Sequence, residues 1–276
     1  MVRGVVRTLC LAGVAWLAFG FSPIARACDL SEPEPGTVVT VIDGETLALA
    51  DGRSVRLIGA KAPMPPLGWR GDDPWPLVEE ARSALAELAA GKAVELRFVG
   101  PRTDRYGRLL AYAFVRADGK TLWLQEAMLA KGLARFYSFP GHRACATVLL
   151  AAESEARGKR LGVWSSPAYR ILEASDLDRL DRLMHSYQLV EGKVVAVGEG
   201  GSRLYLNFGE DWRGDFTVSI ARKNVEAFSA AGIDLKALAG KGVRVRGTLF
   251  WRNGPMIEAT HPEQIQLLPE VARQAM

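Results

Sequence analysis

Two carboxylates and an arginine lie close together near the beginning of the chain, in the stretch VIDGETLALADGRSVRLIGAKAPMPP. The carboxylates are Asp43 and Glu45, and the arginine is Arg56. Carboxylate oxygens are ligands for hard cations such as calcium, and a guanidinium pairs with two phosphate oxygens at once. The following loop contains Lys61 and Met64 but no acid. The stretch is therefore a metal-dependent active site, the remains of one, or only a hairpin.

Short strands and turns surround these residues. Apolar and β-branched residues alternate along the strands, and Asp51-Gly52 is a favourable hairpin turn. Apolar residues at helical spacing from Leu77 onward, stopped by Gly91, predict the first helix. The predicted strands are 38–42, 46–50, 54–58, 94–99 and 109–115, and the predicted helices are 77–90, 122–131 and 145–157. Five such strands favour a small closed barrel with the helices packed outside it.

A second β-rich part follows a connector. Leu177, Leu180 and Leu183 are spaced three apart, which predicts a helical connector over 170–185. The strands predicted after it are 189–197, 204–208, 216–220, 243–250 and 256–259, with a helix over 224–230. Three strands, a helix and a hairpin is the order of an OB-type barrel. The predicted fold class is mainly β with helices (α+β), in two barrels of which the second is smaller.

The first 27 residues have the pattern of a secretory signal peptide. Arg3 and Arg7 precede an apolar run over 9–21, and Ala-Arg-Ala ending at Ala27 is a small-x-small cleavage pattern. The run is short for a transmembrane helix, so we expect no membrane span in the mature chain. We therefore predict export to the periplasm or the medium after cleavage near Ala27. A membrane anchor and a lipid on Cys28 are less favoured alternatives. The predicted organisation is a signal peptide (1–27), a first domain (37–166), the connector and a second domain (186–268).

The charge balance excludes a strongly basic body. The chain has 35 basic and 31 acidic residues and a net charge of +4. Three of the arginines fall within 1–27, which leaves 32 basic residues against 31 acids, or +1. A strongly basic body would indicate non-specific binding of nucleic acid, and this charge balance does not. The segment 102–143 nevertheless has eight Lys and Arg against three acids, so a local basic surface remains open.

Two cysteines remain after the predicted cleavage, Cys28 and Cys145. In an exported protein, an even pair predicts a disulfide, which would hold the N-terminus against a helix. The three histidines, His142, His185 and His261, are scattered and lack metal-ligand spacing, so we expect surface or packing roles for them.

Six short motifs in the first part occur together in one known family. They are V-I-D-G-E-T (41–46), V-R-L-I-G (55–59), T-D-R-Y-G-R (103–108), A-D-G-K (117–120), Q-E-A-M-L-A-K-G-L-A (125–134) and L-G-V-W (161–164). In this order they resemble the thermonuclease family, the staphylococcal-nuclease-like domains, over about 37–165. The resemblance implies a five-stranded OB-type barrel with three helices. It also implies one bound calcium ion and hydrolysis of the phosphodiester backbone of DNA and RNA.

The arginines of the family's site match this sequence. Arg56 and Arg108 correspond to the two arginines that grip the phosphate and neutralise charge that develops in the transition state. Tyr106 stands where the family has a tyrosine near the phosphate. Glu45 stands at the first metal ligand, where the family has the shorter aspartate.

The other acidic positions of the family do not match. Its second metal carboxylate falls at Lys61, which cannot ligate a cation and repels it. Its general base falls at Met64, which accepts no proton. Ala62 keeps the backbone carbonyl that ligates in the family. General-base catalysis contributes about 10²–10⁴-fold, and the metal's Lewis acidity several kcal/mol besides, so these replacements predict weak or lost hydrolysis.

Two rescues of the site remain open. In one, Lys61 takes the place of the metal as a fixed cation and gives metal-free phosphate binding. In the other, Asp72, Asp73 or Glu79 folds back and supplies the missing acids. The alternative for Asp72 and Asp73, which we favour, is an N-cap before Pro74.

The arginines also have a structural alternative. Arg56 and Arg108 could form salt bridges with Glu45 or Asp43 instead of holding a phosphate, and Arg56 could meet Glu45 across the hairpin. We expect Asp43 to order its own turn, and Asp104 to order the TDRYGR turn.

The second domain mixes aromatic residues with arginines, as OB barrels that stack bases do. These are Arg203, Tyr205, Phe208, Trp212, Arg213, Phe216, Trp251 and Arg252. Acids surround Trp212, and residues 171–276 have 13 bases against 14 acids. We therefore expect core packing or contact with a protein partner for most of these aromatics.

Three functions follow. The first is an exported module that binds nucleic acid or another phosphodiester, a possible pseudoenzyme. The second is an active metal-dependent nuclease with a rearranged carboxylate site. The third is an envelope interaction protein with no nucleic-acid role. The replacements at Lys61 and Met64 favour the first of these, and make calcium a doubtful cofactor.

Overall fold

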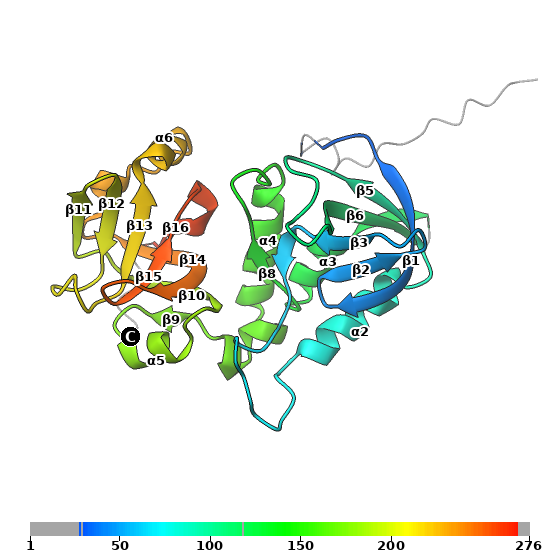
Figure 1. Cartoon of the computed structure of the whole chain (residues 1–276), viewed down its shortest axis with the longest axis horizontal. Helices are drawn as coiled ribbons and strands as arrows, with labels where there is room; N and C mark the ends of the chain where they lie inside the picture. Colours follow the sequence, from blue (N-terminus) through cyan, green and yellow to red (C-terminus); the bar gives the residue numbers. More distant parts are fainter. Residues whose placement is uncertain (1–27, 29, 118, 270–276) are drawn as a thin grey trace, which may run out of the picture.

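A computed structural model describes residues 28, 30–117 and 119–269. Two β-barrels lie side by side, with α4 and β8 between them (Figure 1). The predicted signal peptide, 1–27, lies outside the described residues, so cleavage and export stay predictions. None of the helices in the described part of the chain has the length and apolar character that crossing a bilayer requires.

The first barrel closes with five strands, as predicted. Its strands run in the order β3-β2-β1-β5-β6, and β3 pairs with β6 to close the circle. Their bounds are β1 Glu34–Asp43, β2 Thr46–Leu49, β3 Ser54–Leu57, β5 Ala93–Arg97 and β6 Leu109–Ala117. The helices are α2 Val78–Ala89, α3 Leu124–Ala130 and α4 Ala146–Gly158. A two-stranded ribbon, β4 Gly59–Lys61 with β8 Arg135–Tyr137, lies beside this barrel and was not predicted.

Alternation places the core of this barrel. Leu47 and Leu49 on β2, and Val55 and Leu57 on β3, are all buried. The helix predicted over 122–131 is wrong at its start, because β7 (Lys120–Trp123) pairs with β6 before α3 begins. Trp123 is buried and stacks on Phe114, with ring centroids 5.6 Å apart. The apolar spacing of this segment also suits a helix. Packing of the Trp123 indole therefore stabilises it as a strand.

The predicted disulfide is confirmed. Cys28 and Cys145 are bonded, with their Cα atoms 5.1 Å apart, and both are buried. The bond fixes the start of the described chain to the N-terminus of α4.

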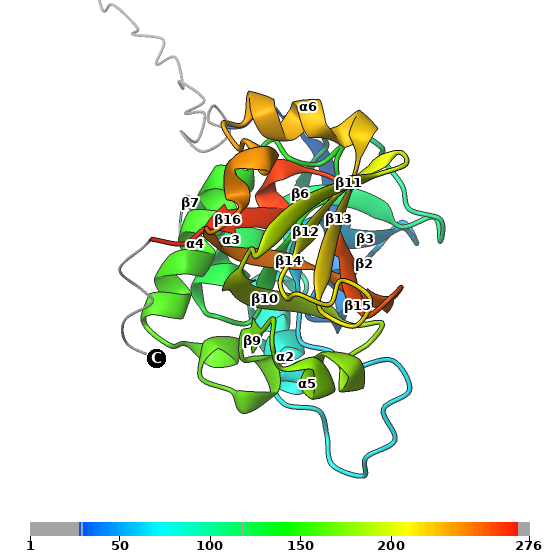
Figure 2. The same cartoon turned by 90° about the vertical axis from the view of Figure 1, so that its left-hand side faces the viewer.

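The second barrel has the strand order of an OB fold. Its strands are β10 Tyr187–Lys193, β11 Ala196–Gly200, β12 Arg203–Asn207, β13 Thr217–Ala221, β14 Gly242–Trp251 and β15 Pro255–Glu258. They run β11-β12-β13-β15-β14-β10. The two end strands of this order, β11 and β10, are consecutive in the sequence. The sequence predicts them as one strand over 189–197. The helix α6 (Arg222–Ala230) lies at one end of the barrel (Figure 2).

Short elements complete this half. The connector contains β9 (Leu172–Glu173) and α5 (Leu177–Arg182), and β16 (Ile265–Leu267) pairs with β14. Short 3₁₀ turns lie at Gly162–Trp164, Pro167–Tyr169, Leu235–Leu238 and Pro262–Gln264. Each barrel has its own buried apolar cluster.

A buried ion pair joins the two barrels. Arg246 of β14 donates to both carboxylate oxygens of Glu153 on α4, at 3.1 and 2.8 Å. Both side chains are at most 3% exposed. Glu153 also accepts from the backbone N–H of Phe136 at 2.7 Å, and the hydroxyl of Tyr187 donates to the Phe136 carbonyl at 2.6 Å. Because these bonds satisfy the buried charges, the domains meet through a specific polar junction.

His261 is a second polar contact between the domains. Its Nε2 lies 2.6 Å from the hydroxyl of Ser138, and its Nδ1 lies 2.9 Å from the hydroxyl of Thr260. Thr260 donates its own proton to Gln264, so it accepts from Nδ1, and Ser138 then donates to Nε2. We therefore assign a neutral imidazole to His261.

This imidazole predicts a loss of stability in acid. Burial lowers the pKa of His261 from 6.5 to about 4. The folded protein thus binds fewer protons than the unfolded chain between these values, so stability is full above pH 6.5 and falls as the pH drops towards 4. The loss amounts to roughly 3 kcal/mol at most. Urea unfolding from pH 7 to 4 measures it, and His261→Gln should flatten the curve. An equal acid loss in the variant would contradict the assignment.

Candidate functional site

The turn between β1 and β2 places Glu45. Asp43 Oδ1 accepts from the backbone N–H of Glu45 at 2.8 Å, which is the turn role expected for Asp43. A Cβ on Gly44 would lie 2.7 Å from the Cβ of Ala62 and 2.9 Å from that of Ala81. Only glycine therefore lets this turn pack against both the β4 loop and α2.

Three donors surround the Glu45 carboxylate. Arg56 Nη1 lies 2.5 Å from Oε1, and Lys61 Nζ lies 3.2 Å from the same oxygen. The backbone N–H of Ala62 donates to Oε2 at 2.7 Å. The pairing of Arg56 with Glu45, expected as one alternative, is thus present. Glu45 is only 3% exposed, so it is a buried carboxylate between two cations.

These residues do not fit a calcium ion. The resemblance assigns Glu45 to the first metal ligand and Lys61 to the position of the second. Glu45 Oε1 is already in contact with two cationic groups, and one of them is Lys61 itself. Calcium requires six to eight oxygen ligands. Within residues 28, 30–117 and 119–269, no cluster of three or more His, Cys, Asp or Glu could hold a metal ion.

The TDRYGR turn places Arg108. Asp104 Oδ1 accepts from the backbone N–H groups of Tyr106 and Arg108, at 2.9 and 3.0 Å. Gly107 has a φ of 78°, which a residue with a side chain rarely adopts. Asp104 Oδ2 also accepts from Nε of Arg108 at 2.8 Å. Burial by itself would raise the pKa of Asp104, but the hydrogen bonds from Arg108 and Tyr106 lower it. Asp104 therefore orders the turn as expected, and the alternative pairing of Arg108 with Glu45 or Asp43 is wrong.

Tyr106 stands at the rim with two arginines beside its ring. It is 67% exposed. The guanidinium carbons of Arg105 and Arg108 lie 4.8 and 5.5 Å from its ring centroid, and Arg105 donates to its hydroxyl at 2.6 Å. An aromatic face between guanidinium groups can stack a base next to a bound phosphate.

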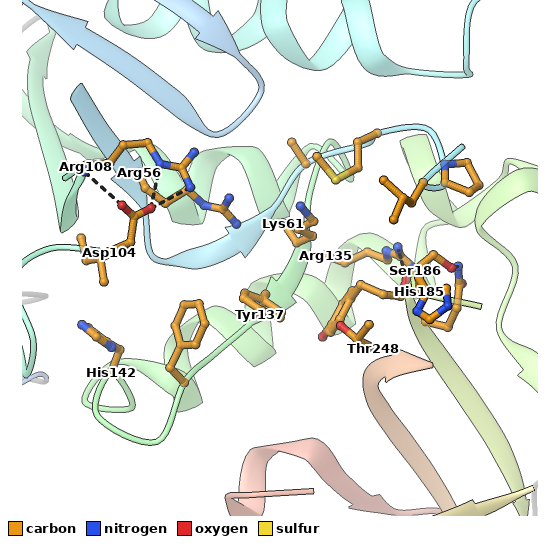
Figure 3. Close-up of a pocket in the computed structure, with 18 of the residues that line it drawn as sticks. Arg56, Lys61, Asp104, Arg108, Arg135, Tyr137, His142, His185, Ser186 and Thr248 are labelled. Atoms are coloured by element: carbon orange, nitrogen blue, oxygen red, sulfur yellow. Dashed lines mark hydrogen bonds and ion pairs between the residues drawn. The ribbon is translucent and has the colours of Figure 1, made fainter. Parts of the chain in front are cut away.

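A cleft of about 940 Å³ joins these groups. Figure 3 shows Arg56, Lys61 and Arg135 along it. Among the described residues that line it, five are Lys or Arg and one is an acid, Asp104. The cations are Arg56, Lys61, Arg105, Arg108 and Arg135. The cleft is thus strongly positive although the mature chain is predicted to be nearly neutral, and such a cleft attracts anions.

The loop acids do not complete the site. Asp72, Asp73 and Glu79 are absent from the described lining, and Glu79 pairs instead with Arg82 on the exposed face of α2. The N-cap interpretation of Asp72 and Asp73 is also wrong. The N-cap is Leu77, which has a φ of 64° and no side-chain cap bond.

The sequence did not indicate the far wall of the cleft. Arg135 and Tyr137 come from β8, His185 from the end of the connector, and Ser186 and Thr248 from the second domain (Figure 3). An arginine inside the apolar segment L-A-R-F-Y is a signal that could have singled out Arg135. Docking of one barrel on the other leaves no local pattern in the sequence. The other residues of this wall therefore had no signal that could have identified them.

The aromatics that the sequence singled out in the second domain lie outside the described lining of the cleft. Phe216 is fully buried and packs against Phe208 at 5.0 Å between ring centroids. Trp212 and Trp251 are 48% and 60% exposed and do not belong to the described lining of the cleft. These residues therefore do not stack bases in the cleft, and among the described residues Tyr187 is the aromatic of the second domain that lines it.

Comparison with known proteins identifies the family of the first domain. The family model described as staphylococcal nuclease homologue matches residues 54–166. The chain is also 36% identical to Protein ParB of Escherichia coli over 141 residues. These residues are 48% of this chain and 73% of that protein. The chain belongs to the staphylococcal nuclease family. The matched stretch contains Arg56, Lys61 and Arg108, whereas Glu45 precedes it.

Other relatives share part of their length with the chain. Endonuclease YncB of Bacillus subtilis is 38% identical over 96 residues, which are 34% of this chain and 44% of that protein. Staphylococcal-like nuclease CAN1 of Arabidopsis thaliana is 35% identical over 118 residues, which are 43% of this chain and 31% of that protein. The chain thus spans less than half of either named nuclease.

Proposed function

We propose that this protein binds nucleic acid or another phosphodiester in the cleft, without a metal ion and with weak or lost hydrolysis. The observation that carries the proposal is the contact of Lys61 Nζ with Glu45 at 3.2 Å. An ammonium group thereby stands at the position where the family has its second metal carboxylate. It is a fixed cation beside Arg56, which pairs with the same carboxylate oxygen.

The arginines supply the grip on the phosphate. Arg56 uses one terminal nitrogen on Glu45, and Arg108 is oriented by Asp104. Both line the cleft and retain donors that no described acid takes, and a guanidinium binds two phosphate oxygens in its fork. Tyr106 would stack the adjacent base.

The described lining of the cleft has no free carboxylate to activate water. Met64 lines it at the position of the family's general base, and a thioether does not accept the proton of water. Asp104 is the one acid of the described lining, and Arg108 with two backbone N–H groups takes its oxygens. Tight phosphate binding with little turnover is the chemistry that this set supports.

An active nuclease is the second candidate. The relative named Endonuclease YncB, which is 38% identical over 96 residues, favours it. Our proposal also includes export after cleavage near Ala27, which rests on the sequence alone. Contact of a protein partner with the second barrel is the remaining alternative.

Oligonucleotide binding by an Arg56→Gln variant tests the proposal. We expect the variant to bind single-stranded DNA about tenfold or more weakly than the wild type, since a hydrogen bond to a charged group contributes about 1.5–3 kcal/mol. Fluorescence anisotropy at several salt concentrations measures this. Glu45 keeps Lys61 and the Ala62 N–H as partners, so the variant should fold.

Arg53→Gln is the matched control. Arg53 lies on the same hairpin, pairs with Asp51 and is not among the described residues of the cleft. It should bind like the wild type. Calcium-dependent cleavage that Glu45→Ala abolishes would establish the nuclease instead. A wild type with neither binding nor cleavage would leave the protein-contact alternative.

A further inference from the structure

Two cations face one another across the ribbon formed by β4 and β8. Lys61 and Arg135 are directly opposed residues of this antiparallel pair, so their side chains leave the ribbon on the same face. Tyr137 is on that face too, whereas Ala60 and Phe136 are buried on the other. Like charges directly opposite one another destabilise a sheet. The pairing of Lys61 with Arg135 therefore needs a reason beyond the fold.

Arg135 is buried without a carboxylate partner among the described residues. It is 7% exposed, and its Nη2 donates to the backbone carbonyl of Tyr187 at 2.7 Å. Its Nη1 is buried and has no hydrogen-bond partner in the described part of the chain. The nearby Glu153 is held by Arg246. An unpaired N–H of a buried guanidinium costs free energy, which an anionic ligand would recover.

Two tyrosine rings lie beside the guanidinium. Its carbon lies 5.4 Å from the ring centroid of Tyr169 and 5.2 Å from that of Tyr187. Both rings line the cleft together with Arg135, and so do Ser186 and Thr248 of the second domain. Figure 3 shows Lys61 between Arg56 and Arg135 along this wall. The charge of Glu45 is shared by Arg56 and Lys61, so the three cations have a surplus of positive charge.

We propose that Arg135, opposite Lys61 at the junction of the two domains, forms a second phosphate-binding site in the cleft. The proposal rests on the proposed function and extends it. The site takes the phosphate next along the strand from the one held by Arg56 and Arg108. The second domain thereby serves binding, because the Tyr187 carbonyl fixes Arg135 and Ser186 supplies a hydroxyl in the same cleft.

The salt dependence of binding to a short oligothymidylate strand tests this site. Each phosphate contact adds about 0.7 to the slope of log affinity against log salt for a single strand. Arg135→Gln should lower the slope by about that amount and the affinity by about tenfold. Arg56→Gln should have a similar effect. In the double variant the slope should fall by about 1.4, because the two arginines hold different phosphates.

Controls separate loss of the site from loss of the fold. Arg143→Gln removes another arginine that joins the domains, through Glu263 at 2.7 Å, but it lies outside the described lining. It should keep the full slope. Arg135→Lys keeps the charge and should retain most of the slope even if it melts at a lower temperature. Thermal melting of every variant shows whether the two domains still unfold as in the wild type.

The outcomes distinguish the two proposals. If Arg56→Gln lowers the slope and Arg135→Gln leaves it unchanged, the second site is wrong and the first stands. If the double variant loses no more than either single one, both arginines hold one phosphate and the second site is again wrong. Inorganic phosphate could raise the melting temperature of the wild type but not of Arg135→Gln, while both bind the oligothymidylate equally well. The site would then take free phosphate, and the proposal that it holds a phosphate of a nucleic-acid strand would be wrong. If the wild type binds no strand, the proposed function itself fails.

Discussion

A Lys61→Asp, Met64→Glu double variant is expected to bind calcium and to cleave single-stranded DNA at least about 100-fold faster than the wild type. Lys61 Nζ lies 3.2 Å from Glu45 Oε1, so the first change replaces a repelling ammonium by a carboxylate next to an existing one. The second change places a proton acceptor in the cleft, which Met64 lines. Glu45 keeps Arg56 and the Ala62 N–H, so the fold should hold.

Calcium titration by calorimetry and cleavage of a fluorogenic strand measure the result. Lys61→Ala is the control for the metal, because it removes the repulsion without adding a ligand. Met64→Glu alone is the control for the base. A folded double variant that binds no calcium would show that the residues at positions 61 and 64 do not account for the lack of a metal site.

The second large effect concerns the junction of the domains. Glu153→Gln is expected to lower the free energy of unfolding by about 3–5 kcal/mol, because it leaves the buried Arg246 without its carboxylate. Burial by itself would raise the pKa of Glu153, but Arg246 and the Phe136 N–H lower it. The pair therefore stabilises the fold above the unfolded pKa of 4.5, and this contribution is lost as the pH falls through the lower folded value.

Urea unfolding at pH 7 measures this loss. Glu155→Gln is the matched control on the same helix, because the Glu155–Lys159 pair is exposed and should matter little. Glu153→Leu with Arg246→Met should recover most of the stability, since an apolar pair can replace a buried ion pair. A Glu153→Gln variant as stable as the wild type would contradict a structural role for this junction.

Local patterns sufficed for much of the fold. The apolar alternation of β2 and β3 places both strands, and their hairpin brings Glu45 near Arg56. The even pair of cysteines predicted the bond between Cys28 and Cys145. Each of these features depends on residues that a single motif or count identifies.

Features that depend on tertiary packing were not predictable. The strand β7 is held by the stacking of Trp123 on Phe114, which apolar spacing does not show. The first turn of α2 begins at Leu77 in a left-handed conformation, so no capping residue marked it. The cleft itself is completed by Ser186 and Thr248 from the other barrel. Sequence spacing carries no information on such contacts until the domains are docked.

The affinity for single-stranded DNA, measured with a chelator and again with excess calcium, tests the central claim most directly. Because the proposal puts Lys61 in the place of the metal, the wild type should bind equally well in both solutions, and the strand should remain uncleaved. Binding or cleavage that requires calcium and disappears with the chelator would contradict a metal-free phosphate site.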